Sequence, residues 1–309
     1  MRRRTFLRLA PATGLLAACG GSSAIRLALN WKPDPQFGGF YAADYGAHGL
    51  EVEILPGGAS TPTVQMIGAG SAEFGIVSAD EIVVARSRGN DVVALFAVFQ
   101  TCPQGIMVHA SRGLTSIGEV VKEGTLAMSS GLPYARLLKE KYGFDHVRVV
   151  PSPGGDVTAF LNDPLFAQQC FVMSEPLVAR SKGADVQVFP VADLGYNPYT
   201  TVLATRDQML LDNLEEAKSM VAAVREGWRR YLDNPKPTDE RMHGLNPSMD
   251  PASFAAVAEA QRPFIETDET KRSGLGVMTR ERWATLARQL AELGDIPKAP
   301  PADECFRQL

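Results

Sequence analysis

The chain has 309 residues, 31 Lys and Arg against 35 Asp and Glu, and a formal net charge of −4 at pH 7. Residues 1–18 contain four arginines and no acidic residue, so the rest of the chain carries 27 basic and 35 acidic residues, a net charge of −8. This acidic body argues against nucleic acid as a partner, because neutralising phosphates needs a basic surface. A small anion is not excluded, since a helix N-terminus can hold one whatever the net charge.

The first residues have the pattern of an export signal. Residues 3–8, RRTFLR, match a twin-arginine signature, and a short, weakly apolar run follows. Residues 16–19, LAAC, match a lipobox, so we expect cleavage before Cys19, lipidation of its thiol, and a flexible tether over residues 20–23. The alternative is an ordinary secretory signal with an incidental cysteine. We expect an extracytoplasmic protein anchored by lipid, because no later run reaches the roughly 18 apolar residues of a membrane span.

The stretch at residues 27–50 is predicted to organise the ligand site. LALN at 27–30 predicts a strand, the Pro-broken segment 31–36 predicts a turn, and 38–45 predicts a helix. Trp31 therefore follows a strand and precedes a helix, where open α/β sheets bind ligands. We expect Asn30, Trp31, Phe37 and Tyr41 to contact the ligand. The alternative is that these aromatic residues are core.

From residue 24 onward, short apolar runs bounded by Gly or Pro alternate with helical patterns, which predicts a doubly wound α/β fold with largely parallel strands. This length favours two lobes. We expect residues 105–113 and 199–207 to be paired crossover strands, with lobe one at 24–108 plus 204–309 and lobe two at 109–203. A helix face at Met220, Val224, Trp228 and Tyr231 predicts core, and the Pro-rich tail from Ile296 predicts loose order.

Further loops at predicted strand ends add candidate contacts. Ser78 and Asp80 are N-cap candidates, and the one that does not cap is free to face the ligand. Glu175 is either a ligand contact or a first-turn carboxylate favoured by the helix dipole. Residues 195–199, GYNPY, are expected to form a wall opposite Trp31. The candidate ligand contacts are Asn30, Trp31, Phe37, Tyr41, Ser78, Asp80, Gln100, Ser130, Gly131, Tyr134, Glu175, Tyr196, Asn197 and Tyr199.

Residue types used for catalysis or metal binding form no recognisable pattern. Beyond Cys19, the cysteines Cys102, Cys170 and Cys305 contain no CxxC pair, so the spacing indicates neither a metal site nor a disulfide framework. One disulfide is compatible with an oxidising compartment. The four histidines are not paired at ligand spacing, and no Ser/His/Asp or Cys/His grouping is evident.

The opening segment resembles that of the SsuA/THI5-like (NMT1 family) solute-binding proteins, especially the lipoproteins that bind thiamin pyrimidine precursors. Asn30, Trp31, Pro33 and Tyr41 match its motif, whereas Phe37 stands where the family often has His. The similarity continues from residue 57 to Gln100. It implies a type II periplasmic-binding-protein fold, with two doubly wound lobes joined by two crossover strands, that serves an ABC importer.

The same resemblance includes an enzyme branch, the fungal pyrimidine synthases, which hold pyridoxal phosphate on a lysine and carry a Cys-rich run. These features fall on Val77 and on residues 196–199 of this chain, so both are missing. We therefore predict a non-catalytic, monomeric receptor without a cofactor. It would close on a small planar heterocycle, such as a thiamin pyrimidine precursor, and deliver it to a permease in the inner membrane. The alternatives are a receptor for a flavin or an alkyl sulfonate, or a pyrimidine-synthase-like enzyme.

Overall fold

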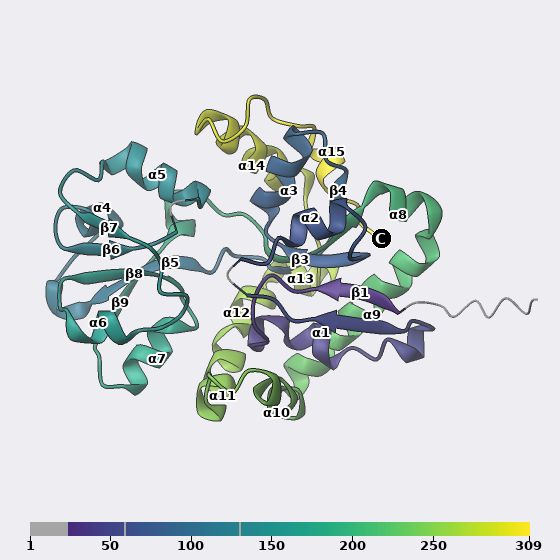
Figure 1. The fold of residues 1–309 in the computed structure, drawn as a ribbon, viewed down its shortest axis with the longest axis horizontal. Helices are drawn as coiled ribbons and strands as arrows, with labels where there is room; N and C mark the ends of the chain where they lie inside the picture. Colours follow the sequence, from purple (N-terminus) through teal and green to yellow (C-terminus); the bar gives the residue numbers. More distant parts are fainter. Residues whose placement is uncertain (1–23, 59, 130) are drawn as a thin grey trace, which may run out of the picture.

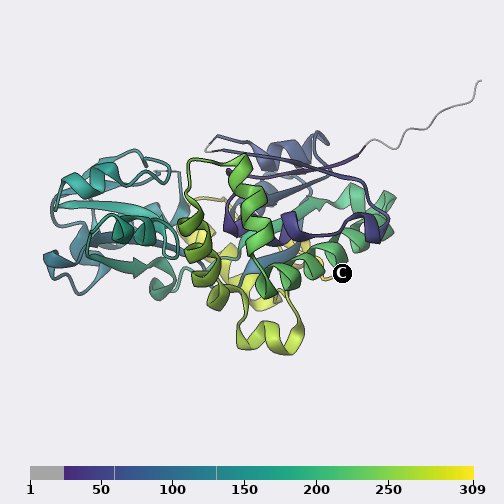
Figure 2. The same ribbon diagram turned by 90° about the horizontal axis from the view of Figure 1, so that it is seen from below.

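A computed structural model describes residues 24–58, 60–129 and 131–309. Two lobes lie side by side along the long axis of the molecule, each built on a five-stranded sheet (Figures 1 and 2). The predicted export signal and Cys19 lie outside the described residues, as does Ser130. Within those ranges, no helix has the length and apolar character needed to cross a membrane.

The sheet of lobe one has the strand order β2-β1-β3-β10-β4. Its strands are β1 (Ile25–Ala28), β2 (Val52–Leu55), β3 (Phe74–Val77), β4 (Val92–Phe99) and β10 (Thr200–Arg206). The first three run parallel, while β10 is antiparallel to both β3 and β4. The strand β4 is buried at all eight positions, as its uninterrupted apolar sequence requires.

The sheet of lobe two has the order β7-β6-β8-β5-β9. Its strands are β5 (Gln104–His109), β6 (Thr125–Ala127), β7 (Arg148–Val150), β8 (Phe166–Phe171) and β9 (Val186–Pro190). The strands β6, β7 and β8 run parallel, and β5 is antiparallel to β8 and β9. The expected α/β fold with two lobes is therefore present, and each sheet combines a parallel core with an antiparallel strand.

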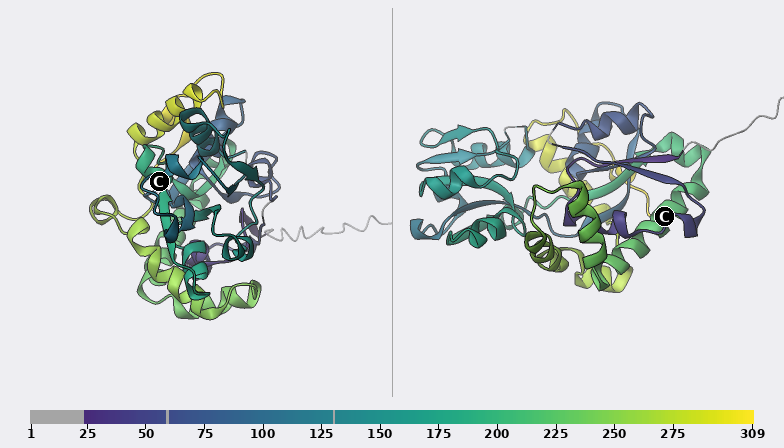
Figure 3. Two further views of the ribbon diagram at one scale, coloured as in Figure 1. Left: turned by 90° about the vertical axis from the view of Figure 1, so that its left-hand side faces the viewer. Right: turned by 60° about the horizontal axis from the view of Figure 1, so that its bottom comes forward.

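Helices cover the sheets of both lobes (Figure 3). Those of lobe one are η1 (Pro35–Phe37), α1 (Gly38–Ala42), η2 (Gly46–His48), α2 (Thr63–Gly68), α3 (Ala79–Ser87), α8 (Asp207–Asp212), α9 (Leu214–Asp233), α10 (Lys236–Leu245), α11 (Pro251–Ala260), α12 (Arg262–Ile265), α13 (Asp268–Ser273), α14 (Arg280–Glu292) and α15 (Ala302–Cys305). Those of lobe two are η3 (Ala110–Arg112), α4 (Ile117–Val120), α5 (Pro133–Tyr142), α6 (Thr158–Asn162), α7 (Glu175–Ser181) and η4 (Val191–Leu194).

The chain crosses between the two sheets at residues 100–103 and 191–199, which differs from the expected crossovers. The strands β5 and β10 belong to different sheets and do not pair with each other. The expected lobe boundaries after Val108 and Leu203 therefore fall inside strands. Because a strand's backbone groups are satisfied by its own sheet, the crossovers must lie outside these ladders.

The predicted core face of α9 is confirmed, since Met220, Val224, Trp228 and Tyr231 are all buried. This helix packs on α1, where a Cβ at Gly39 would lie 2.2 Å from Trp228 Cγ. Only glycine permits such a close approach of the two helices.

The C-terminal segment is packed against lobe one rather than loosely ordered. Arg307 N donates to Ala94 O at 2.8 Å, and the rings of Phe306 and Trp283 stack with centroids 5.9 Å apart. The Pro-rich composition of this segment limits regular structure. It does not prevent docking on the core.

Candidate functional site

The loops that leave the parallel strands of both lobes face one another between the lobes. In Figure 1 the strand β1 enters lobe one from the outer side and ends toward lobe two. Because β2 and β3 run parallel to β1, their following loops lie at the same edge. In lobe two, the loop after β7 carries Gly154, and α7, which follows β8, begins at Glu175. The approach of Gly154 to Trp31 of lobe one identifies the interlobe face as the candidate cleft.

Trp31 lies where the two lobes meet. Its carbonyl accepts a 3.0 Å hydrogen bond from Gly57 N, which ties together the loops after β1 and β2. Its Cη2 lies 3.5 Å from the place of a Cβ on Gly154 in lobe two. The tryptophan is only partly buried and packs on the core of lobe one with its remaining surface. The position therefore suits an aromatic wall of a cleft.

Asn30, beside Trp31, supplies an unused acceptor. Its Oδ1 is buried and has no hydrogen-bond partner among the residues that the structure describes. Buried polar atoms normally have partners, so an unpaired one beside the candidate cleft is a candidate ligand contact.

Asp34 is a site residue that the sequence analysis missed. It caps η1, and its carboxylate accepts hydrogen bonds from Gln36 N and Gln36 Nε2, both at 3.0 Å. Burial raises the pKa of Asp34 to about 7, and the charge of Glu175 adds to this effect. An Asp between two prolines predicts a turn cap, but the burial that raises its pKa depends on the tertiary fold and leaves no signal in the local sequence.

Glu175 brings a second carboxylate to the same face from lobe two. Its Oε2 accepts from Phe171 N at 2.8 Å, and its Oε1 lies 3.9 Å from the place of a Cβ on Gly155. Burial raises its pKa. Across the described ranges, neither Glu175 nor Asp34 forms an ion pair. The two lobes thus face each other with carboxylates that lack a neutralising cation.

Two of the proposed aromatic contacts are in the core of lobe one instead. Phe37 is fully buried, and Tyr41 packs beneath Arg241, whose guanidinium carbon lies 5.3 Å from the ring centroid. Both side chains belong to the cluster that α1 forms with α9. Both residues follow the loop of Trp31 closely in the chain, but their side chains point into lobe one because they lie on the buried face of the helical segment.

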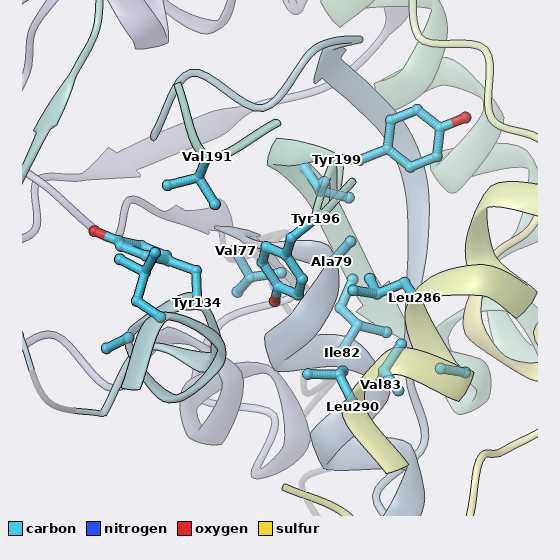
Figure 4. Close-up of a cluster of buried hydrophobic side chains, with 14 of the residues drawn as sticks. Val77, Ala79, Ile82, Val83, Tyr134, Val191, Tyr196, Tyr199, Leu286 and Leu290 are labelled. Atoms are coloured by element: carbon cyan, nitrogen blue, oxygen red, sulfur yellow. The ribbon is translucent and has the colours of Figure 1, made fainter. Parts of the chain in front are cut away.

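Tyr196 and Tyr199 do not form a wall opposite Trp31, because they belong to a different buried cluster (Figure 4). The Tyr196 hydroxyl donates to Asp80 at 3.0 Å, and both side chains are buried. Tyr199 points away from Tyr196, and its hydroxyl accepts from Thr279 N at 3.0 Å. Each phenol is therefore satisfied within the fold, as buried tyrosines usually are.

Three polar candidates also have structural partners. Asn197 Oδ1 accepts from Cys102 N at 2.7 Å, so it joins the two interlobe segments. Gln100 is buried, and its Nε2 donates to Ala97 O and Val277 O, each at 3.1 Å. The Ser78 N–H donates to Glu81 Oε2 at 2.8 Å at the start of α3, as in a capping box.

The remaining candidates lie in lobe two. Gly131 is exposed. Tyr134 is buried, and it belongs to the hydrophobic cluster that also includes Tyr196 and Val77 (Figure 4). Burial raises its pKa well above the ordinary value for tyrosine. Tyr134 is therefore an interlobe packing residue.

A metal site needs a cluster of donor side chains, and a reactive cysteine needs a thiol with a lowered pKa. Within residues 24–58, 60–129 and 131–309, no group of three or more His, Cys, Asp or Glu side chains is placed to hold a metal ion. Cys102, Cys170 and Cys305 are free and buried. Burial raises the pKa of the Cys102 thiol to about 12, so this group is protonated at neutral pH.

The family model described as NMT1/THI5 like matches residues 34–238. The chain belongs to the NMT1/THI5-like family. The predicted resemblance is thus confirmed over two thirds of the sequence, including the loops that carry Asp34 and Glu175.

Comparisons over the whole chain agree with the family assignment. A formylaminopyrimidine-binding protein from Halalkalibacterium halodurans is 21% identical over 333 residues, which cover 100% of this chain and 99% of that protein. The periplasmic aliphatic sulphonate binding protein SsuA from Escherichia coli aligns with a TM-score of 0.69 and 15% identity, over 93% of both chains. The desulfurization enzyme DSZB aligns with a TM-score of 0.60 and 16% identity, over 92% of this chain and 96% of that one. The periplasmic-binding-protein fold is thereby confirmed.

Proposed function

We propose that this protein is the solute-binding component of an ABC importer and that it binds a small planar heterocycle bearing amino groups, such as a thiamin pyrimidine precursor. The observation that carries this proposal is the pair of carboxylates, Asp34 and Glu175, presented from opposite lobes beside Trp31. Carboxylates accept hydrogen bonds from exocyclic amines, and a tryptophan face stacks on a planar ring. The formylaminopyrimidine-binding relative supports the same ligand class.

An alkyl sulfonate is the second candidate, and the likeness to the sulphonate-binding protein SsuA favours it. A sulfonate site needs hydrogen-bond donors around its anion, and the backbone N–H groups of Gly57 and Gly58 are the candidates, but the Gly57 N–H donates to Trp31 O at 3.0 Å. The Gly58 N–H likewise donates to Thr61 Oγ1 at 2.8 Å. Two carboxylates without a neutralising cation would also repel the sulfonate group. We therefore propose the planar heterocycle, rather than the sulfonate, as the ligand.

An enzymatic role is supported only by the fold shared with DSZB. A fold by itself does not determine an activity. The position that would hold the lysine of a pyrimidine synthase is Val77, which is fully buried. The protonated state of Cys102 makes that thiol a poor nucleophile. These residues support a receptor that binds its ligand without changing it.

The setting of this function is inferred from the predicted export signal. We infer that the protein works outside the cytoplasm as a monomer, held at the membrane by lipid on Cys19, where it can meet its permease. The tether over residues 20–23 would let the two-lobed body move relative to the membrane. A flavin remains an alternative ligand of the same planar class.

Identification of a copurifying ligand by native mass spectrometry tests the proposal. Calorimetry should then compare formylaminopyrimidine, riboflavin and an alkyl sulfonate on the same preparation. We expect formylaminopyrimidine to bind most tightly. If the sulfonate binds best, the carboxylate pair has been misinterpreted, and binding of none of the three would reject the proposed ligand class.

A further inference from the structure

The two segments that join the lobes are bonded to lobe one up to Cys102 in the first and from Gly195 onward in the second, which locates the points about which the lobes can turn. We propose that the hinge consists of two pivots, at Cys102–Pro103 and at Gly195, and that Arg282 is the positioning residue that clamps both segments to lobe one. The inference concerns the connection between the lobes, and only its ligand-binding measurement rests on the proposed function.

In the first segment, residues 100–103, the hydrogen-bond partners change from lobe one to lobe two within one or two residues. Gln100 N donates to Phe264 O at 2.7 Å, and its side chain donates to two further carbonyls of lobe one. Pro103 O accepts from Val172 N of lobe two at 2.8 Å. Because the proline ring fixes the φ of Pro103, rotation is left to the bonds of Cys102 and to the ψ of Pro103.

The second segment, residues 191–199, changes lobe at a single glycine. Gly195 N donates to Ala192 O at the end of η4, whereas Gly195 O accepts from Gln289 Nε2 of lobe one, both at 2.9 Å. Gly195 has a φ of +85°, which only glycine adopts readily, and no atom lies within 4 Å of the place of its Cβ. A shallow cavity of about 250 Å³ adjoins it, so the backbone has room to rotate.

Arg282, in the first turn of α14, connects both segments. Its Nε donates to Asn197 O at 2.8 Å, its Nη2 to Asn197 Oδ1 at 3.1 Å, and its Nη1 to Gln100 O. The guanidinium carbon lies 3.9 Å from the ring centroid of Tyr199. Asn197 Oδ1 also accepts from Cys102 N. One planar fork thus fixes the backbone of one segment and both the backbone and the side chain of the other.

The charge of Arg282 has no carboxylate partner among the residues that the structure describes. Burial lowers its pKa, which shows that the charge is held at a cost. A hydrophobic residue would avoid this cost but would leave the carbonyls of Asn197 and Gln100 without donors. We therefore expect Arg282 to fix the geometry of the two interlobe segments rather than to increase the stability of the fold.

All contacts of Arg282 lie on the lobe-one side of the two pivots. The clamp therefore need not break when the lobes turn, and it favours neither the open nor the closed arrangement. Its effect is to keep residues 196–199 and 100–101 rigid, so that the rotation is confined to the two pivots and the lobes turn about one axis. Without it, these segments would have to be ordered each time that the lobes close.

Interlobe distances measured without ligand test this inference directly. Spin labels attached through a ketone-bearing amino acid at the exposed positions Glu140 and Glu240 leave the buried cysteines untouched. In Arg282→Met we expect a broader distance distribution than in the parent. Asn197→Ala, which removes the shared acceptor, should broaden it as well. Arg282→Lys, which can satisfy one carbonyl but not the whole fork, should lie between the parent and Arg282→Met.

Arg225→Met is the matched control. Arg225 also donates to backbone oxygens, those of Leu275 and the terminal Leu309, and also lies over an aromatic ring, Phe96, but none of these contacts involves an interlobe segment. It should lower the melting temperature without broadening the distances. An unchanged distribution in Arg282→Met, or equal broadening in Arg225→Met, would overturn the inference.

A binding measurement adds a second readout with formylaminopyrimidine as the probe. Ordering about one additional residue on closure should weaken binding by Arg282→Met roughly tenfold. If the parent does not bind this probe, the proposed ligand is wrong, and the hinge is judged on the ligand-free distances alone. If the parent binds and Arg282→Met binds equally tightly, the clamp does not act on closure.

Discussion

The hydroxyl of Tyr196 and the carboxylate of Asp80 lie 3.0 Å apart, although 116 residues separate them in the chain. The sequence predicted both as ligand contacts, because Tyr196 lies beside a Pro turn and Asp80 lies at the start of a helix. In the fold, each is the other's buried partner. Asp80 also accepts from Glu81 N at 3.0 Å, so its carboxylate is used within lobe one.

Removing this hydroxyl should therefore affect stability and not ligand binding. Tyr196→Phe leaves the buried carboxylate short of one donor, which should cost about 1–3 kcal/mol of unfolding free energy. Urea denaturation measures this loss. Affinity for formylaminopyrimidine should stay within about twofold of the parent. A large loss of affinity at unchanged stability would return Tyr196 to the ligand site.

Trp31 should dominate binding through its exposed face. Stacking of one base on an aromatic side chain is worth roughly 1–3 kcal/mol, so Trp31→Ala should weaken binding by about one to two decades. Trp31→Phe keeps a smaller ring and should recover part of the affinity. Titration calorimetry measures both variants, and circular dichroism checks that they fold. Parental affinity in Trp31→Ala would mean that the side chain only packs on the core.

Glu175 should decide which class of ligand binds. In Glu175→Gln, an aminopyrimidine loses a charge-assisted hydrogen bond, which should weaken binding by about tenfold. A ligand without an amino group should be spared, and an alkyl sulfonate should bind better than to the parent because a repelling charge is gone. Glu240→Gln, on the exposed surface of α10, controls for a general loss of charge. Equal losses for all ligands would point to a structural role of the Glu175 bond to Phe171 N.

Asp34 should make stability depend on pH near neutrality. Its pKa in the folded protein, about 7, lies above the value of about 4 in the unfolded chain, so the folded state binds more protons between these values. Stability should therefore fall as pH rises from 5 to 8. Glu81, whose burial also raises its pKa to about 7, acts in the same direction. The groups with lowered pKa values, such as Asp250, change their protonation below about pH 4, so they do not contribute to the change in stability between pH 5 and 8.

The expected decrease is about 1–3 kcal/mol of unfolding free energy, corresponding to one or two pKa units. Urea denaturation at pH 5, 6.5 and 8 gives the profile. Asp34→Asn should have a flatter pH profile. Its loss of unfolding free energy relative to the parent should be smaller at pH 8 than at pH 5. If Asp34→Asn and the parent respond equally to pH, the carboxylate is ionised and solvated in the folded state.

Cys19 should carry the lipid. Cys19→Ala lacks the thiol to which the acyl group is attached, so labelled palmitate should no longer be incorporated. The protein should then be released from membranes. Arg3→Lys combined with Arg4→Lys should leave the precursor in the cytoplasm. Labelled Cys19→Ala would contradict the lipoprotein assignment, and normal processing of the double lysine variant would show export by the general secretory route.

The sequence by itself determined the features that depend on local pattern. Alternating apolar runs and helical periods predicted two lobes of α/β structure, and the spacing of Met220, Val224, Trp228 and Tyr231 identified a core face. The strand, turn and helix around Trp31 placed this tryptophan at the carboxyl end of a parallel strand. Side-chain alternation and turn chemistry act over a few residues, so they can be predicted without the fold.

The tertiary structure alone decided which polar and aromatic loop residues face the ligand. Trp31, Tyr196 and Tyr199 all lie beside Pro turns, but α14, which follows some 80 residues after Tyr199, covers the two tyrosines and leaves Trp31 at the interlobe face. Asp34 acquires its raised pKa because the fold buries it, and the charge of Glu175, 141 residues further along the chain, adds to the effect. Arg282 joins segments about 180 and 85 residues distant. Burial and pairing depend on residues far apart in the chain, and no local pattern records which of them will meet.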